Sequence, residues 1–100
     1  MVLFDLPNVS KAEKRNYAKF RKEIMNDGFM MLQYSIYTRF CRDVQDAQKH
    51  IKRVKLAAPQ DGNIRILCVT EKQYEDMILV IGEKSPTEEA IKKDYVVVIE

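Results

Sequence analysis

The 100-residue sequence predicts an α+β fold in which helices cover one face of a sheet. Three observations support this fold class. The chain starts with a short apolar run, two later segments have the apolar periodicity of amphipathic helices, and runs rich in β-branched and aromatic residues lie between and after them. With 46% hydrophobic and 32% charged residues, the composition is that of an ordinary globular protein. No apolar run approaches the roughly 18 residues needed for a membrane span.

The first strand and the first helix have clear boundaries in the sequence. Val2 to Leu6 is a nearly continuous apolar run ended by a proline, so we interpret it as a buried, central strand. Ser10 and Glu13 form a capping-box pattern, in which each side chain satisfies a backbone N–H of the first helical turn. We expect the helix to end at Asp27, with Gly28 adopting the left-handed conformation of a C-terminal cap.

A helical projection separates two faces of this first helix. Tyr17, Phe20 and Ile24 fall within one narrow arc, which must pack on the sheet, and Glu13 lies near them. The opposite arc is basic and must face water or an anion. It contains Lys11, Lys14, Arg15, Arg21 and Lys22.

Residues 29–40 are strongly β-forming but too long for one ordinary strand, so we expect a bend or a split near Gln33. Simple alternation places Met31, Gln33, Ser35, Tyr37 and Arg39 on one face. A second helix is predicted over residues 43–57. Its expected buried stripe is Val44, Ala47, Ile51, Val54 and Ala58, with His50 beside it in a packing or surface role.

The remaining segments predict further strands. A turn at 59–63 precedes a strand from Ile64 to Val69, and a capping pattern at Thr70 begins a helical turn that reaches Met77. Ile78 to Ile81 and Tyr95 to Ile99 then have the composition of strands.

Two such apolar runs would be an aggregation hazard as free edges, so we expect them to pair, with intersubunit pairing as the favoured arrangement. The expected organisation is a ferredoxin-like domain over residues 1–81. Residues 82–100 are then a linker and an extra C-terminal strand at a dimer interface formed through the sheets.

Charge is distributed unevenly along the chain. Residues 1–56 contain 12 Lys/Arg and 6 Asp/Glu, a balance of +6, whereas residues 57–100 contain 5 and 9, a balance of −4. The basic half can face a polyanion, although solvated surface charge is the alternative. Cys41 and Cys68 lack the spacing of metal ligands, and the first residues lack the basic region of a signal peptide. We therefore expect reduced cysteines and a cytoplasmic location.

The predicted element order is that of the ferredoxin-like βαββαβ plan, which supports many functions. Within it, Asp5 ends the first strand, where its carboxylate can reach solvent. Mg²⁺ usually takes one or two protein carboxylates and completes its shell with water or phosphate. One Asp5 is a poor site, but a two-fold dimer could pair two copies. The alternative is a strand-end aspartate that only caps or solvates a turn.

Five short motifs occur in a characteristic order. They are Phe4-Asp5-Leu6-Pro7, Arg15-x-Tyr17-x-x-Phe20-Arg21-Lys22 with Asp27-Gly28-Phe29, Gln33-Tyr34-Ser35-Ile36-Tyr37, Gly62-Asn63, and Thr70-Glu71-Lys72-Gln73-Tyr74. Together they resemble the small CRISPR-associated protein of spacer acquisition, the Cas-two (Cas2) family, most closely the version of type II systems. Met31 stands where some relatives have Arg, and Phe4 where others have Tyr.

The resemblance implies a symmetric homodimer whose C-terminal strands cross onto the partner's sheet. It also implies a partnership with the CRISPR integrase, Cas-one, in a complex that captures a short DNA duplex for antiviral defence. Many members of the family are described as metal-dependent endonucleases on RNA or double-stranded DNA. In that account Asp5 would be both the catalytic residue and the Mg²⁺ ligand at the dimer interface.

These observations leave three functions open. The first is a DNA-bridging subunit of an integration complex, and the second is a Mg²⁺-dependent endonuclease centred on Asp5. The third is a stand-alone, toxin-like endoribonuclease on the same fold, and a small regulatory sensor is a further alternative. For nucleic-acid binding the candidate residues are Lys11, Lys14, Arg15, Arg21, Lys22 and Arg39.

Overall fold

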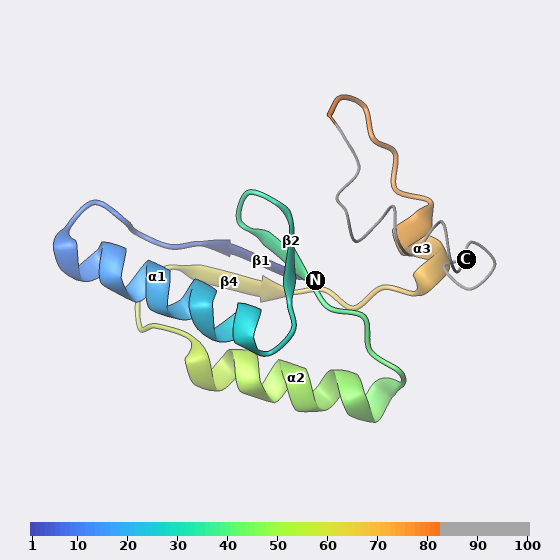
Figure 1. Ribbon diagram of the computed structural model, residues 1–100, viewed down its shortest axis with the longest axis horizontal. Helices are drawn as coiled ribbons and strands as arrows, with labels where there is room; N and C mark the ends of the chain where they lie inside the picture. The colour runs from blue at the N-terminus through green and yellow to red at the C-terminus, as the bar shows by residue number, and fades with distance from the viewer. Residues whose placement is uncertain (83–100) are drawn as a thin grey trace. The chain divides into compact units, whose positions relative to one another are not determined.

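In the computed structural model, which describes residues 1–82, the chain divides into two compact units, Met1–Leu67 and Cys68–Glu100. The first unit has the element order βαββαβ (Figure 1), which confirms the predicted α+β, ferredoxin-like plan. Its elements are β1 (Val2–Asp5), α1 (Lys11–Asn26), β2 (Met30–Gln33), β3 (Ile36–Thr38), α2 (Val44–Ala57) and β4 (Asn63–Ile66). The described part of the second unit contains the short helix α3 (Glu71–Glu75).

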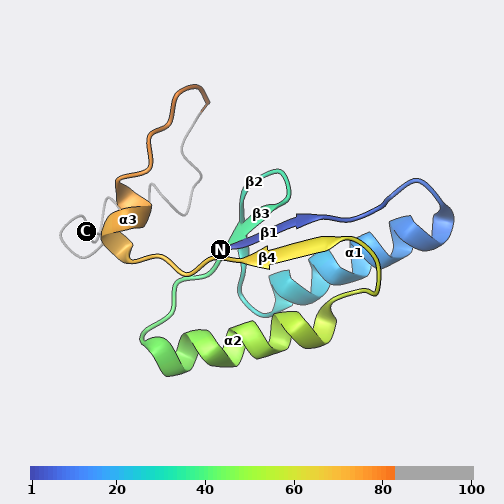
Figure 2. The ribbon, with the colours of Figure 1, turned by 180° about the vertical axis from the view of Figure 1, so that it is seen from behind.

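The four strands form one antiparallel sheet in the order β2-β3-β1-β4. β1 is therefore central, as its apolar sequence predicted, and runs beside β4 in Figure 2. The β1–β4 pairing extends beyond the strands. The Met1 ammonium group donates to the Leu67 carbonyl oxygen at 2.8 Å, and the Leu67 N–H donates to the Met1 carbonyl oxygen at 2.8 Å.

The predicted split in residues 29–40 is confirmed. β2 ends at Gln33, and a turn through Ser35 leads directly into β3. Ser35 has φ 65°, in the left-handed region that non-glycine residues seldom adopt. The pairing of β2 with β3 also shifts register between Met31 and Gln33, so the simple alternation expected for one long strand does not hold across this hairpin.

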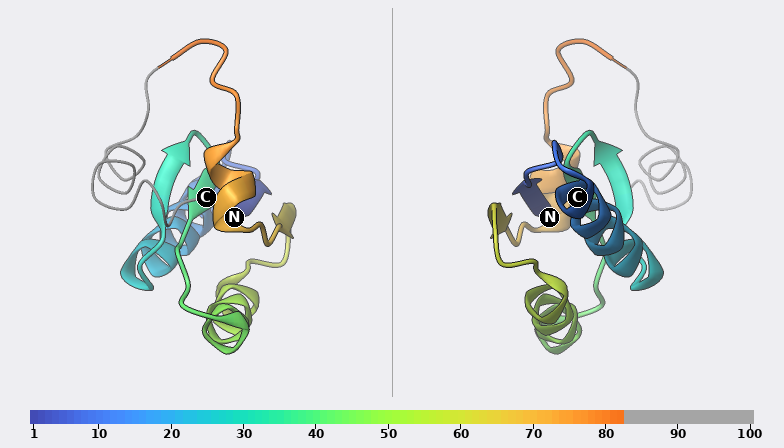
Figure 3. Two further views of the ribbon diagram at one scale, coloured as in Figure 1. Left: turned by 90° about the vertical axis from the view of Figure 1, so that its right-hand side faces the viewer. Right: turned by 90° about the vertical axis from the view of Figure 1, so that its left-hand side faces the viewer.

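Both long helices cover the same face of the sheet (Figure 3). Val2 and Phe4 point toward them and are buried, whereas Leu3 and Asp5 alternate to the other face. The Phe4 ring meets the rings of Phe20, Tyr37 and Tyr17 at centroid distances of 5.2, 5.6 and 5.8 Å. This aromatic cluster fixes β1 against α1, as the predicted apolar arc of the helix required.

The ends of α1 match the sequence prediction. The Ser10 hydroxyl accepts from the Glu13 N–H at 3.1 Å, while the Glu13 carboxylate accepts from the Ser10 N–H at 2.9 Å. Gly28 follows the helix with φ 94°, as expected for a left-handed cap. A second predicted capping box, between Thr70 and Gln73, begins α3.

The predicted buried stripe of α2 was wrong at both ends. Val44 is 71% exposed and Ala58 is exposed, while His50 and Val54 are the buried positions. Val44 lies in the first turn and Ala58 is the C-cap, where a helix has the fewest neighbouring elements to cover it. The periodicity thus identified the helix correctly but predicted a longer buried stripe than the structure has.

The segment from Ile78 to Ile81, predicted as a strand, forms no strand within the single chain, and its expected intersubunit pairing stays a prediction. These residues are exposed and are not in a strand. An apolar run becomes a strand only where a neighbour satisfies its backbone groups, and residues 1–82 pair no strand with this segment. The predicted strand from Tyr95 to Ile99 lies outside the described residues. None of the helices found within residues 1–82 is both long and apolar enough to cross a membrane.

Candidate nucleic-acid interface and carboxylate site

Asp5 lies at the point where β1 leaves the sheet. Its backbone is opposite Asn63 of β4, its side chain is exposed, and the next residue, Leu6, is buried. A solvent-facing carboxylate therefore follows directly on a rigid central strand. Among residues 1–82 there is no group of three or more His, Cys, Asp or Glu side chains that could hold a metal ion, so Asp5 offers one ligand of its own.

Gly62 holds the backbone at this end of the sheet. It has φ +108°, and a Cβ atom there would lie 2.6 Å from Leu6 Cδ2 and 2.9 Å from the Asp5 carbonyl oxygen. Any larger residue would have to push β1 and β4 apart where Asp5 leaves the sheet. The turn thus keeps the carboxylate at a defined place relative to β4.

Gly62→Ala should therefore destabilise the protein by about 2–4 kcal/mol, from backbone strain plus the clash with Leu6 and Asp5. The midpoint of urea unfolding measures this loss. Gly82→Ala is the matched control, because Gly82 also has a positive φ of +119° but a Cβ there would meet only Leu79 Cδ1, at 3.7 Å. Equal losses in the two variants would contradict the close contact at Gly62.

The exposed side of α1 carries four of the six predicted nucleic-acid-binding residues. Within residues 1–82 these four side chains are exposed and have no ion pair, whereas Lys49 and Arg53 of α2 are paired with Asp46 and Asp27. We call them the α1 cationic stripe, which consists of Lys11, Lys14, Arg15 and Lys22. Unpaired cations on one side of a helix are the feature that phosphate-backbone contacts require.

The other two predicted residues make contacts within the fold. Arg21 Nε donates to the Tyr37 hydroxyl oxygen at 2.6 Å and so ties α1 to β3. Arg39 Nε donates to the Asp27 carbonyl oxygen at 2.9 Å, and its Nη1 donates to the Phe40 carbonyl oxygen at 3.0 Å. Sequence position alone did not show these contacts, because the partners are 16 and 12 residues away in the chain.

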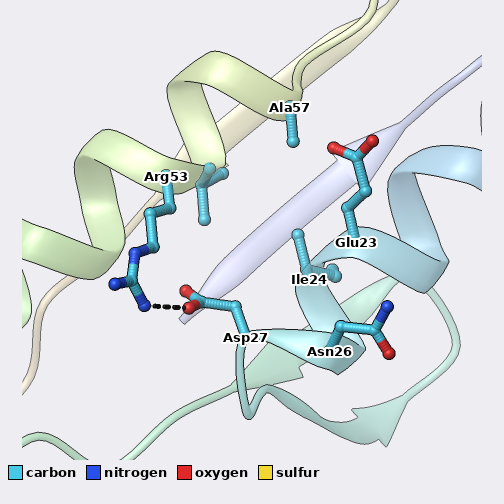
Figure 4. Close-up of a pocket in the computed structure, with 7 residues that line it drawn as sticks. Glu23, Ile24, Asn26, Asp27, Arg53 and Ala57 are labelled. Carbon is cyan, nitrogen blue, oxygen red and sulfur yellow. Dashed lines mark hydrogen bonds and ion pairs between the residues drawn. The ribbon is translucent and has the colours of Figure 1, made fainter.

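An ionic cluster that the sequence did not indicate joins the end of α1 to α2. His50 Nδ1 lies 2.6 Å from Asp27 Oδ2. Arg53 Nη1 donates to Asp27 Oδ1 at 2.6 Å (Figure 4). Burial alone would raise the pKa of Asp27, but the hydrogen bonds from His50 and Arg53 outweigh it and hold that pKa below its usual value. His50 is 2% exposed, so of the packing or surface role predicted for it the structure shows packing.

Asp46 extends this cluster on α2. Its Oδ1 lies 3.4 Å from His50 Nε2, and its Oδ2 accepts from the Arg42 N–H at 3.1 Å. The Arg42 N–H, followed by Lys49 and His50, lowers the pKa of Asp46 to about 2 although burial opposes the shift. His50 is therefore placed between two carboxylates that remain charged at neutral pH.

A cavity of about 280 Å³ lies beside the cluster, between the end of α1 and the last turns of α2 (Figure 4). Ile24, Val54 and Ala57 supply apolar walls. Asp27 and Arg53 form an ion pair at the edge of the cavity. Asp5 is not among the lining residues, so the cavity and the carboxylate site are separate features.

Tyr34 is another residue that the sequence did not indicate as a candidate for the site. It is 72% exposed, in the turn between β2 and β3, although it is a large aromatic. The neighbouring Tyr17 hydroxyl, and to a smaller extent the Asp5 carboxylate, raise the pKa of Tyr34 above its usual value. A contact between the turn and the end of β1 could be found only in the folded chain.

Comparison with known proteins gives one consistent result. The family described as CRISPR associated protein Cas2 matches residues 1–77. A protein of Acidovorax ebreus (strain TPSY) named CRISPR-associated endoribonuclease Cas2 is 46% identical over 82 residues, which are 82% of this chain and 80% of that protein. A protein of Ligilactobacillus salivarius (strain UCC118) with the same name is 43% identical over 84 residues, 84% of this chain and 83% of the relative.

Proposed function

Because this chain belongs to the CRISPR-associated protein Cas2 family, we propose that it is a CRISPR adaptation protein that binds duplex DNA as a homodimer and bridges the integrase, Cas-one, for spacer acquisition. The observation that carries the DNA-binding part is the α1 cationic stripe, whose four side chains are exposed and have no ion pair among residues 1–82. Contacts of this kind position a duplex without reading its sequence, as a spacer-capturing protein requires.

The sheet supports the dimer in this proposal. On the face opposite the helices, Leu3 lies between its register partners Ile36 on β3 and Arg65 on β4. Asp5 alternates to the same face as Leu3. Two copies packed through this face would bury the apolar pair and bring two Asp5 carboxylates toward each other, and the α1 cationic stripe would be duplicated on the outside of the dimer.

The DNA-binding part is tested by the charge-reversal variant Lys14→Glu/Arg15→Glu. We expect it to weaken binding of a short duplex by at least about tenfold, equally for unrelated sequences, and to lower the salt slope by about one unit per lost phosphate contact. Fluorescence anisotropy across a salt series measures both quantities. The same series, repeated with the co-encoded integrase present, measures binding by the bridged complex.

Lys52→Glu/Lys55→Glu is the matched control, because it makes the same charge change on exposed positions of α2. It alters the net charge equally but leaves the α1 cationic stripe intact, so its effect should be small once salt screens distant charges. Unchanged affinity of Lys14→Glu/Arg15→Glu at low salt would refute the proposed interface.

We propose endonuclease activity as a second function, since the relatives compared above are named endoribonucleases. In this proposal Asp5 from each copy holds Mg²⁺ together with water and substrate phosphate, which suits an ion that needs few protein carboxylates. The bound ion would supply a nucleophilic water and stabilise charge on the scissile phosphate. A stand-alone endoribonuclease role is the alternative to bridging, and would require cleavage without the integrase.

A further inference from the structure

The four described strands contain only two charged residues, Asp5 of β1 and Arg65 of β4. The two strands are neighbours, and their register pairs Arg65 with Leu3. The residues on either side of Arg65, Ile64 and Ile66, pack against the core beneath the helices. Because side chains alternate along a strand, Arg65 points to the open face of the sheet, which it shares with Leu3 and Asp5.

Arg65 lies close enough to Asp5 for its side chain to reach a group bound there. The register partner of Asp5 is Asn63, two residues before Arg65, so Arg65 is a diagonal neighbour of Asp5. Diagonal neighbours on one face of an antiparallel pair are about 7–8 Å apart, within reach of a long side chain. The pairing is continuous from here to Met1 and Leu67, which exchange both backbone hydrogen bonds at 2.8 Å.

The charge of Arg65 is not used within residues 1–82. The residue is exposed, and in this part of the chain its guanidinium forms neither an ion pair nor a hydrogen bond, not even with Asp5. The Nε atoms of Arg21 and Arg39, in contrast, donate to oxygens of the fold at 2.6 and 2.9 Å. The guanidinium of Arg65 therefore remains available to an anion from outside the chain.

A nucleic acid strand that approaches Asp5 needs a cation on this face of the sheet, because the carboxylate repels its phosphate groups. The α1 cationic stripe does not supply it, since both long helices cover the opposite face (Figure 3). β2 and β3 contain no charged residue. Among the four described strands only Arg65 places a cation here. A guanidinium also suits a phosphate well, because it donates two parallel N–H groups to two oxygens.

We propose that Arg65 is a further substrate-contact residue, whose guanidinium binds a phosphodiester group of the nucleic acid strand that lies at Asp5. The inference rests on the proposed endonuclease activity and adds the phosphate-binding group to it. β4 is the outer strand of the described sheet, so Arg65 lies at the rim of the open face, where a strand can enter beside a second copy. Asp5 then serves the ion, and Arg65 serves the substrate.

The test measures binding of a short single-stranded RNA by fluorescence anisotropy across a salt series, with EDTA present so that no metal contributes. Arg65→Gln should weaken binding about 10-fold and lower the salt slope, since a charged phosphate contact is lost. Arg65→Lys keeps the charge but not the planar fork, so it should keep the salt slope and lose about 2–4-fold. The urea midpoints should not change, because the side chain is exposed.

Arg42→Gln is the matched control, because it makes the same charge change outside the sheet. The Arg42 side chain is 88% exposed and is paired only loosely with Asp46, at 4.0 Å. Arg42→Gln should weaken RNA binding by less than about 2-fold. A loss as large as that of Arg65→Gln would show that only the net charge matters, and would overturn the contact.

Exchange of the two charges tests whether the bound phosphate lies at Asp5. Arg65→Asp should lose more affinity than Arg65→Gln, and the added change Asp5→Arg should restore most of the loss, because the neighbouring strand then supplies the cation. Asp76→Arg is the control for this rescue, since it makes the same change at an exposed acid outside the sheet. Equal rescue by the two changes would refute the location.

Other results separate this inference from the proposed function. RNA affinity unchanged in Arg65→Gln overturns the contact, and so does a loss seen with RNA but not with DNA of the same sequence, which would show a contact to the 2′-hydroxyl instead. A loss that disappears at protein concentrations where sedimentation equilibrium shows the variant to be dimeric would show an ion pair between the copies. If Asp5→Ala abolishes cleavage while Arg65→Gln binds RNA normally, only the contact fails. If the unmodified chain neither binds nor cleaves RNA, both fail.

Discussion

Asp5→Ala should reduce metal-dependent cleavage by on the order of 10²-fold or more while leaving the fold and duplex binding intact. In the proposed dimer each copy supplies one Asp5 to the ion, so the substitution removes both of these carboxylates at once. The fold should be unaffected, because the Asp5 side chain is exposed and β1 is held by backbone pairing and by Val2 and Phe4. Gel assays of RNA and duplex DNA cleavage, with Mg²⁺ and with EDTA, measure the effect.

Asp76→Ala is the control for this experiment, because it removes another exposed carboxylate from the described chain, one paired only with Lys72 at 3.4 Å. It should cleave as the unmodified protein does. Full cleavage by purified Asp5→Ala would rule out this site. A variant that loses cleavage but still supports spacer acquisition would show that bridging, and not hydrolysis, is the main role.

Asp27→Ala should lower the free energy of unfolding by about 2–3 kcal/mol, the second large effect that we expect. The carboxylate accepts from His50 and from Arg53, at 2.6 Å each, so its removal leaves His50, 2% exposed, without its Nδ1 partner. Arg53 keeps access to water, which limits the loss. Urea unfolding followed by circular dichroism gives the midpoint, and an unchanged m-value would show that the transition itself is the same.

Glu23→Ala is the matched control, because Glu23 is an exposed acid on the last turns of α1 that lines the same cavity (Figure 4). Glu23→Ala should lower the free energy of unfolding by less than half as much as Asp27→Ala does. Acid titration adds a second readout, since the pKa values of Asp27 and Asp46 are depressed in the folded chain. The stability that these two carboxylates contribute is present above the ordinary Asp pKa of 3.8 and is lost as the pH falls. For Asp46 the loss continues down to a pH of about 2. Asp27→Ala should therefore show a shallower acid decline, and a decline as steep as that of the unmodified protein would contradict this assignment.

The local sequence signals were reliable wherever the deciding contacts are close in the chain. Both capping boxes, the left-handed Gly28 and the split near Gln33 were predicted and confirmed, because each depends on residues a few positions apart. Ile78 to Ile81 form no strand within the single chain for the opposite reason. A strand needs a partner from elsewhere, and composition alone does not supply one.

The same distinction between local and long-range contacts applies to the candidate site. The sequence by itself determined the α+β element order, the exposed carboxylate at the end of β1 and the basic side of α1, since period and position along an element are local properties. Only the tertiary structure decided that Arg21 and Arg39 make hydrogen bonds within the fold and that Asp27 and His50 meet. These contacts join residues far apart in the chain, and strand register and helix packing bring them together.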